Sequence, residues 1–149
     1  MSVFDERAKE WDKKSRRVKL AGEVVSAIIK YAEPAKGIEL ADFGTGTGLI
    51  MLGLADYASR MTGYDTSEGM LQVLRDKASD AGLTNITLVN FDVNAENFPL
   101  DKYDLMTCSM VAHHLDNPDV FFAKSYDSLK FGGKLCVADL VKTDVPFHE

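Results

Sequence analysis

The sequence predicts an α/β fold in which a mostly parallel sheet carries helices on both of its faces. Short apolar segments alternate with longer amphipathic segments along the 149 residues, and this alternation is typical of β–α–β units. Crossovers between parallel strands are right-handed, which places the connecting helices on both faces of the sheet. A glycine-rich turn, Gly44 to Gly48, follows the first apolar segment and leads into a helix. In open α/β sheets, ligands lie at such carboxyl ends of strands.

Proline, glycine and serine residues mark where the expected helices and strands begin and end. Pro34 ends the N-terminal helical region, and Ser67 is suited to cap the start of a helix that Gly82 closes. Pro118 lies in the first turn of the last helix, and Gly132–Gly133 make the turn into the last strand. From the amino end we expect helices over 4–14 and 18–32, a strand over 38–43, a helix over 48–58, a strand over 60–64, a helix over 67–82, strands over 86–91 and 103–109, a helix over 118–129 and a strand over 134–140.

Composition and charge narrow the class of protein. The length suits one domain with one core, and no apolar run approaches the roughly 20 residues that a membrane span needs. The net charge of −6 argues against a nucleic-acid partner, because proteins that bind nucleic acid usually carry a basic surface. Cys108 and Cys136 fall inside expected strands without metal-site spacing, which favours buried thiols in a reducing compartment and a cytoplasmic protein.

The glycine turn discriminates between nucleotide ligands. A dinucleotide fingerprint, G-x-G-x-x-G, needs a third glycine where Leu49 stands, and no Gly-Lys-Ser or Gly-Lys-Thr of a phosphate loop occurs. Asp42 stands two residues before Gly44, where an acid suits an ammonium group better than a pyrophosphate. S-adenosylmethionine carries an ammonium, a carboxylate, a ribose and an adenine, and no phosphate. A nucleotide-dependent oxidoreductase is the disfavoured alternative.

Five segments in order resemble the motifs of the class I S-adenosylmethionine-dependent methyltransferases. They are 42–48, 63–71, 90–93, 103–115 and 129–135. The resemblance covers nearly the whole chain and is nearest to the small-molecule enzymes of ubiquinone and menaquinone biosynthesis. It implies a Rossmann-like fold and methyl transfer to a small-molecule acceptor by in-line displacement.

The resemblance also implies a domain organisation. The family's sheet has seven strands, so a single S-adenosylmethionine-binding domain over 1–149 is expected to be C-terminally incomplete, with 141–149 as the loop after its fifth strand. Helices within 1–32 are expected to cover the cofactor, with Trp11 beside it; for Trp11 the alternative is a partly buried aromatic staple. An uncovered edge of the strand 134–140 would allow a homodimer.

The cofactor residues are assigned by the same resemblance. It implies that the backbone of the turn at Gly44, Thr45 and Gly46 lies under the methionine part of the cofactor. Asp42 is expected near the ammonium group. Asp65 follows Gly46 by about 20 residues, the spacing at which an acid reaches a ribose. The remaining contacts are assigned to Thr66, Met70, Asp92 and Val93 around the adenine, and to Cys108 and Ser109 beneath the reacting methyl.

Two of these assignments have structural alternatives. Met70 has the character of a core residue as well as of an adenine contact. Asp92 can form an Asx-turn with Asn94 instead of accepting a hydrogen bond from the adenine amino group.

The histidines His113 and His114 are the candidate catalytic groups. A histidine titrates near neutral pH and can take a proton from a nucleophile; the alternative is a structural part of the loop, and a metal pair is unconvincing without a third ligand. Because a sulfonium is already activated, alignment of the reactants and exclusion of water can suffice. A non-catalytic domain that binds the cofactor or a partner is the second hypothesis.

Overall fold

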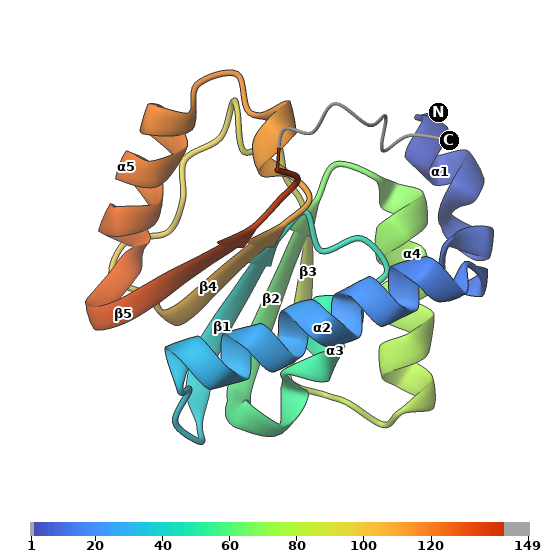
Figure 1. Cartoon of the computed structure of the whole chain (residues 1–149), viewed down its shortest axis with the longest axis horizontal. Helices are drawn as coiled ribbons and strands as arrows, with labels where there is room; N and C mark the ends of the chain where they lie inside the picture. The colour runs from blue at the N-terminus through green and yellow to red at the C-terminus, as the bar shows by residue number, and fades with distance from the viewer. Residues whose placement is uncertain (1, 142–149) are drawn as a thin grey trace.

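The sheet has five parallel strands in the order β3-β2-β1-β4-β5. The structure is a computed structural model that describes residues 2–141. The strands are β1 (Ile38–Phe43), β2 (Ala58–Asp65), β3 (Ile86–Asn90), β4 (Tyr103–Ser109) and β5 (Leu129–Ala138). All five end at the same edge of the sheet (Figure 1). The predicted Rossmann-like α/β architecture is therefore confirmed.

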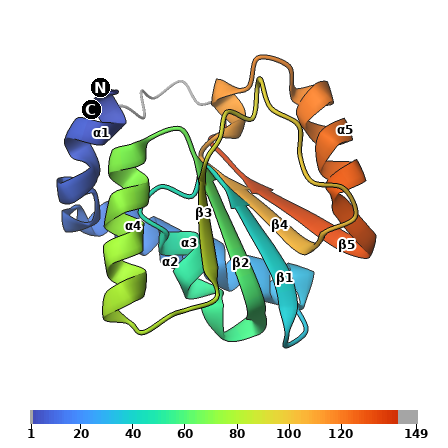
Figure 2. The same cartoon turned by 180° about the vertical axis from the view of Figure 1, so that it is seen from behind.

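Helices cover both faces of this sheet. The α-helices are α1 (Val3–Arg7), α2 (Ser15–Ala32), α3 (Leu49–Gly53), α4 (Glu68–Asp80) and α5 (Pro118–Ser128), and the 3-10 turns are η1 (Ala8–Lys13), η2 (Ala55–Tyr57) and η3 (Ala112–His114). Helices α2, α3 and α4 lie on one face and α5 on the other, as the two opposite views show (Figures 1 and 2). Within residues 2–141, no helix combines the length and the apolar character needed to cross a bilayer.

The alternation of side chains along the strands builds two separate cores. Leu40 of β1 points into an aliphatic core with α2 and α3, whereas Phe43 points into an aromatic core on the α5 face. The Phe43 ring stacks on Tyr64 at 4.7 Å and on Phe98 at 4.6 Å between ring centroids. The glycine turn that follows β1 meets both cores, because a Cβ at Gly48 would lie 2.3 Å from Leu74 of the aliphatic core and one at Gly44 would lie 2.0 Å from Val111, which packs against the aromatic core.

Helix α4 has the limits and the buried face that its sequence predicts. The Ser67 hydroxyl accepts a hydrogen bond from the Met70 N–H at 3.1 Å, which caps the helix start. Gly82, with φ of +68°, follows the helix end. The buried residues are Met70, Leu71, Leu74 and Ala78.

The last strand departs from the prediction. Strand β5 begins at Leu129, directly after α5, and not at residue 134, so Gly132 and Gly133 lie inside the strand and not in a turn before it. Tyr103 pairs with Leu129, and Leu105 pairs with Lys134, so the strand bulges between them. A Cβ at Gly133 would lie 2.9 Å from the Tyr103 carbonyl oxygen. Since the turn glycines were assigned to a loop, the bulge was missed.

The bounds of the other helices and strands differ less from the expected ones. The helix expected over 4–14 is divided into α1 and η1, and the one expected over 48–58 into α3 and η2. Strand β5 is half-exposed to exposed along its length, because within residues 2–141 it has a neighbouring strand only on the β4 side. The loop expected over 141–149 lies, apart from its first residue, outside the described residues.

Candidate functional site

The carboxyl ends of β1 and β2 bring Asp65 onto the glycine turn. The Gly46 N–H donates to Asp65 Oδ2 at 2.8 Å, and the Ser67 N–H donates to Oδ1 at 2.8 Å. Burial raises the pKa of Asp65, and the N–H groups of Ser67, Gly46 and Thr66 oppose that rise. Each carboxylate oxygen still has acceptor capacity after these bonds. Asp65 and the glycine turn therefore lie together at this edge, and a contact of Asp65 with a ribose stays a prediction.

The turn itself offers open space at one glycine. Gly46 has φ of +56°, and no atom lies within 4 Å of the position that its Cβ would occupy. At Gly44 the corresponding position lies 2.0 Å from Val111 Cγ2, so the loop after β4 packs directly on the turn. A carboxylate held by backbone N–H groups beside an unfilled space can accept hydrogen bonds from the hydroxyl groups of a polar ligand.

Asp42 lies beneath this turn and not in its opening. Its side chain is 2% exposed, and the Thr107 hydroxyl donates to Asp42 Oδ1 at 2.8 Å. Burial raises the pKa of this carboxyl to about 7. The buried hydroxyls of Thr107 and Thr45 oppose that rise. A contact of Asp42 with an ammonium group stays a prediction.

The residues assigned to the adenine lie at the same edge in different environments. Thr66 is exposed directly after Asp65, whereas Met70 is 2% exposed on α4 and packs inside the protein. Asp92 adopts the alternative arrangement, because the Asn94 N–H donates to Asp92 Oδ1 at 2.9 Å in an Asx-type turn. Val93 beside it is half-buried. Only one oxygen of Asp92 is used by this turn, so the adenine contact stays a prediction.

The ends of β4 and β5 hold the histidine pair. Cys108 is buried at the end of β4, which raises its pKa to about 12, and Ser109 follows it. His113 on η3 places Nδ1 2.7 Å from Asp139 Oδ1, and the rings of His113 and His114 lie 4.0 Å apart. Asp139 was not singled out in the sequence. Its position directly after a strand, at the edge where the other site residues gather, is the feature that could have indicated it.

The N-terminal strap, defined here as α1 and η1 (Val3–Lys13), is fixed to this edge by two carboxylates. Asp5 Oδ1 accepts hydrogen bonds from the Ser67 hydroxyl at 2.6 Å and from the Gly69 N–H at 2.8 Å. Asp12 Oδ1 accepts from the Thr47 hydroxyl at 2.6 Å.

A lysine and an aromatic residue extend the strap's contacts. Lys77 Nζ lies 2.7 Å from Asp12 Oδ2 and also donates to the Thr47 carbonyl oxygen at 2.7 Å. Trp11 carries the Arg17 guanidinium over its ring at 3.6 Å. The strap therefore lies beside the glycine turn, and its covering of a cofactor stays a prediction. The contacts of Asp5 and Lys77 have no local signature in the sequence.

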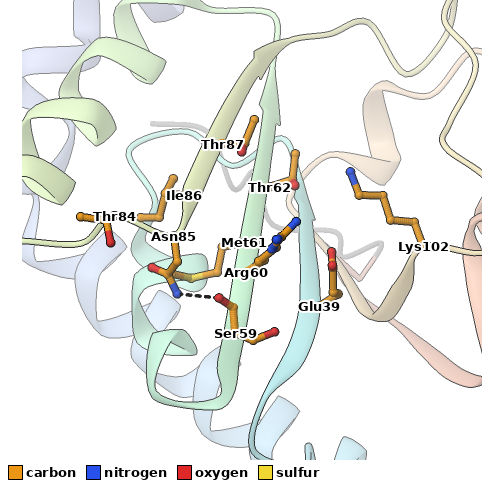
Figure 3. Close-up of a pocket in the computed structure, with 10 residues that line it drawn as sticks. All are labelled: Glu39, Ser59, Arg60, Met61, Thr62, Thr84, Asn85, Ile86, Thr87 and Lys102. Carbon is orange, nitrogen blue, oxygen red and sulfur yellow. Dashed lines mark hydrogen bonds between the residues drawn. The ribbon is translucent and has the colours of Figure 1, made fainter.

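A hollow of about 400 Å³ lies at the opposite end of the strands (Figure 3). It is lined mainly by polar residues of β2, β3 and the adjoining loops, and its charged lining residues are Glu39, Arg60 and Lys102. It shares no residue with the edge described above. Among residues 2–141, no three His, Cys, Asp or Glu side chains are grouped so as to hold a metal ion.

Comparison with known proteins identifies the family. The profile of a methyltransferase domain matches residues 41–137, which span the glycine turn and β1 to β5. The chain belongs to this methyltransferase family. It is 31% identical over 119 residues to an uncharacterized methyltransferase of Schizosaccharomyces pombe, covering 75% of this chain and 42% of that protein. It is 27% identical over 138 residues to a ubiquinone biosynthesis O-methyltransferase of Coxiella burnetii, covering 91% of this chain and 58% of that one.

Solved structures of methyltransferases share the fold. The YcgJ protein of Bacillus subtilis superposes with a TM-score of 0.73 at 26% identity, over 78% of this chain and 50% of that chain. An S-adenosylmethionine-dependent methyltransferase of Methanococcus maripaludis, described as putative in its name, gives a TM-score of 0.78 at 23% identity, over 92% of this chain and 64% of that chain. The chain spans about half the length of the curated relatives it matches.

Proposed function

We propose that this methyltransferase domain binds S-adenosylmethionine and transfers its methyl group to a small-molecule acceptor. The observation that carries the proposal is the contact between Asp65 and the Gly46 N–H beside the unfilled space over the turn. A carboxylate that is already oriented by backbone N–H groups can accept both hydroxyls of a ribose without first having to become ordered.

The residues fit the parts of this cofactor in order along the edge. Asp65 would accept the ribose hydroxyls, and Gly44, Thr45 and Gly46 would lie under the methionine part. When bound, the cofactor supplies a methyl group activated by a sulfonium. The adenine would lie against Thr66, Met70, Asp92 and Val93, the ammonium near Asp42, and the reacting end over Cys108 and Ser109.

The work left to the protein is alignment and exclusion of water. The N-terminal strap, with Trp11, is suited to cover the bound cofactor because it is fixed to Thr47 and to the start of α4. His113 and His114 are the candidate groups for moving a proton. We place the domain in the cytoplasm, since both Cys108 and Cys136 are free thiols.

The class of acceptor is proposed from the net charge of the chain and from the names of its relatives. The net charge of −6 favours a small organic molecule over a nucleic acid. Two of the relatives are named ubiquinone biosynthesis O-methyltransferase and aklanonic acid methyltransferase, and the acceptors in both names are small organic molecules. We also propose that two copies pair through the outer edge of β5, which has no neighbouring strand within residues 2–141.

Calorimetric titration with S-adenosylhomocysteine and, separately, with NAD tests the choice of cofactor. We expect binding of the first and none of the second. Gly46→Val should abolish binding, because a branched side chain would fill the open space at a position with positive φ. Near-native affinity of this variant would show that the turn does not face the ligand.

Transfer of a radiolabelled methyl group from S-adenosylmethionine into a cell extract then tests the reaction. Incorporation into small molecules supports the proposed enzyme. Binding without any incorporation would instead support a non-catalytic cofactor-binding domain, and binding of NAD alone would support an oxidoreductase.

A further inference from the structure

Asp139 and His113 form a carboxylate–imidazole pair at the carboxyl ends of β4 and β5. His113 Nδ1 lies 2.7 Å from Asp139 Oδ1, and the His113 backbone N–H donates to Oδ2 at 3.2 Å. Asp139 Oδ1 also accepts the Leu140 N–H at 2.7 Å. At Ala138, the residue before Asp139, the carbonyl oxygen accepts a hydrogen bond from the Met110 N–H at 2.8 Å. Both partners are thus fixed by backbone contacts as well as by each other.

This pairing selects one tautomer of His113. Burial opposes ionisation of Asp139, but the Leu140 N–H and the hydrogen bonds from His113 outweigh it and lower the pKa of Asp139. An ionised carboxylate has no proton to donate, so Nδ1 must carry the shared proton. The other ring nitrogen, Nε2, is then an unprotonated acceptor in the neutral ring.

The loop that carries His113 packs on the glycine turn. Val111, which packs on Gly44, precedes η3 and His113 in the same short loop. The side chains of His113 and Asp139 are 29% and 16% exposed, so both are partly accessible. Within the described residues, His113 is in contact with two titratable side chains, those of Asp139 and His114. For the His114 ring, by contrast, no hydrogen bond to any of residues 2–141 is formed.

We infer that Asp139 is a positioning residue that holds His113 as the general base, and that the acceptor therefore carries a proton at neutral pH, as a phenol or an enol does. This inference rests on the proposed methyl transfer. The acceptor O–H bond breaks and its proton moves to His113 Nε2. The oxygen forms a bond to the methyl carbon, the methyl–sulfur bond breaks, and its electron pair stays on sulfur. Asp139 stabilises the resulting imidazolium. An acceptor that is already anionic would need none of these residues.

The tautomer can be measured without any ligand. Long-range proton–nitrogen spectra of the labelled protein should show the proton of His113 on Nδ1 in the wild type. Asp139→Asn should allow the Nε2–H tautomer, Asp139→Glu should retain the Nδ1–H form in part, and Asp116→Asn, an exposed acid in the same loop, should change nothing. A wild-type His113 with its proton on Nε2 overturns the inference.

Methyl transfer to two probes tests the acceptor class. Catechol is a phenol that is neutral at pH 7, and thiophenol is already largely anionic there. With catechol, His113→Gln and Asp139→Asn should lower kcat by about a hundredfold or more at neutral pH, and the deficit should shrink towards the phenol's own ionisation near pH 10. Wild-type transfer to thiophenol alone, transfer to neither probe, or an equal loss at every pH overturns the inference.

Binding of S-adenosylhomocysteine separates this inference from the proposed function. If calorimetry shows no binding to the wild type, the proposed cofactor fails, and the His113 tautomer is still decided by its spectrum. If wild type, His113→Gln and Asp139→Asn all bind equally, a rate loss in the variants belongs to proton transfer and not to cofactor binding.

Discussion

At the scale of single residues, Asp65 combines two roles in one carboxylate. It binds the Gly46 and Ser67 N–H groups at 2.8 Å and keeps acceptor capacity for a ribose. Hydrogen bonds to a charged group contribute roughly 1.5–3 kcal/mol each, so Asp65→Ala should weaken S-adenosylhomocysteine binding at least tenfold in calorimetry. Asp56→Ala, an exposed acid on η2, is the control and should bind normally. Unchanged affinity of Asp65→Ala would refute the assignment.

Asp42 predicts a pH dependence of stability. Its pKa is raised by burial from 3.8 to about 7 in the folded protein, so the folded state holds a proton that the unfolded state has released. Its contribution to stability is therefore full below about pH 4 and is lost as the pH rises to about 7, by at most about 1.4 kcal/mol per pH unit. Asp42→Asn keeps an acceptor for Thr107 and cannot ionise, so it should remove this loss.

Urea unfolding at several pH values between about 4.5 and 7.5 measures the effect. The free energy of unfolding of Asp42→Asn, relative to the wild type, should increase with pH across this window. A difference that stays constant with pH would mean that the Asp42 carboxyl titrates normally in the folded protein.

At the scale of elements, the N-terminal strap is held by polar contacts to α4 and the glycine turn, and α1 has no buried residue. A Cβ at Gly69 would lie 2.9 Å from Asp5 Cα and 3.0 Å from the Asp5 carbonyl oxygen, so Gly69→Ala should displace α1. We expect faster tryptic cleavage after Arg7 and Lys9, because a displaced strap opens for the protease while the sheet stays folded.

Gly22 on α2 is the matched control for this substitution. A Cβ there meets no atom within 4 Å, so Gly22→Ala should stabilise the helix by roughly 0.5–1 kcal/mol and leave the strap's cleavage unchanged. Equal cleavage rates in the Gly69→Ala variant and the wild type would show that α1 does not depend on this close contact.

The elements also show what the sequence can and cannot predict. Strands β1 and β4 have the predicted limits, and the buried face of α4 is the predicted one, since local periodicity and caps determine them. The bulge in β5 was missed because it depends on the register with β4, which lies about 25 residues earlier and has no local signature. Asp5 and Asp139 were missed for the same reason, since their partners are distant in sequence.

At the scale of the whole molecule, the sheet has an uncovered edge at β5 within residues 2–141. Phe131 is fully exposed there and Val137 is 40% exposed. Such an edge presents unpaired N–H and C=O groups together with apolar side chains, and a second copy can pair with it. The outer side of β5 faces away from the glycine turn and Asp65, which belong to β1 and β2, so pairing there would leave the proposed cofactor site open in both copies.

A dimer through β5 is the prediction that follows. Light scattering coupled to size-exclusion chromatography should show a dimer of the 149-residue protein. Val137→Lys should weaken association at least tenfold, because a charge at an edge strand opposes pairing. Val120→Lys, the same change at an exposed apolar site on α5, should not. Both variants should bind S-adenosylhomocysteine as the wild type does. A wild-type protein that stays monomeric and active at every concentration tested would exclude β5 as a dimer interface, and equal weakening by both lysines would point to the α5 face instead.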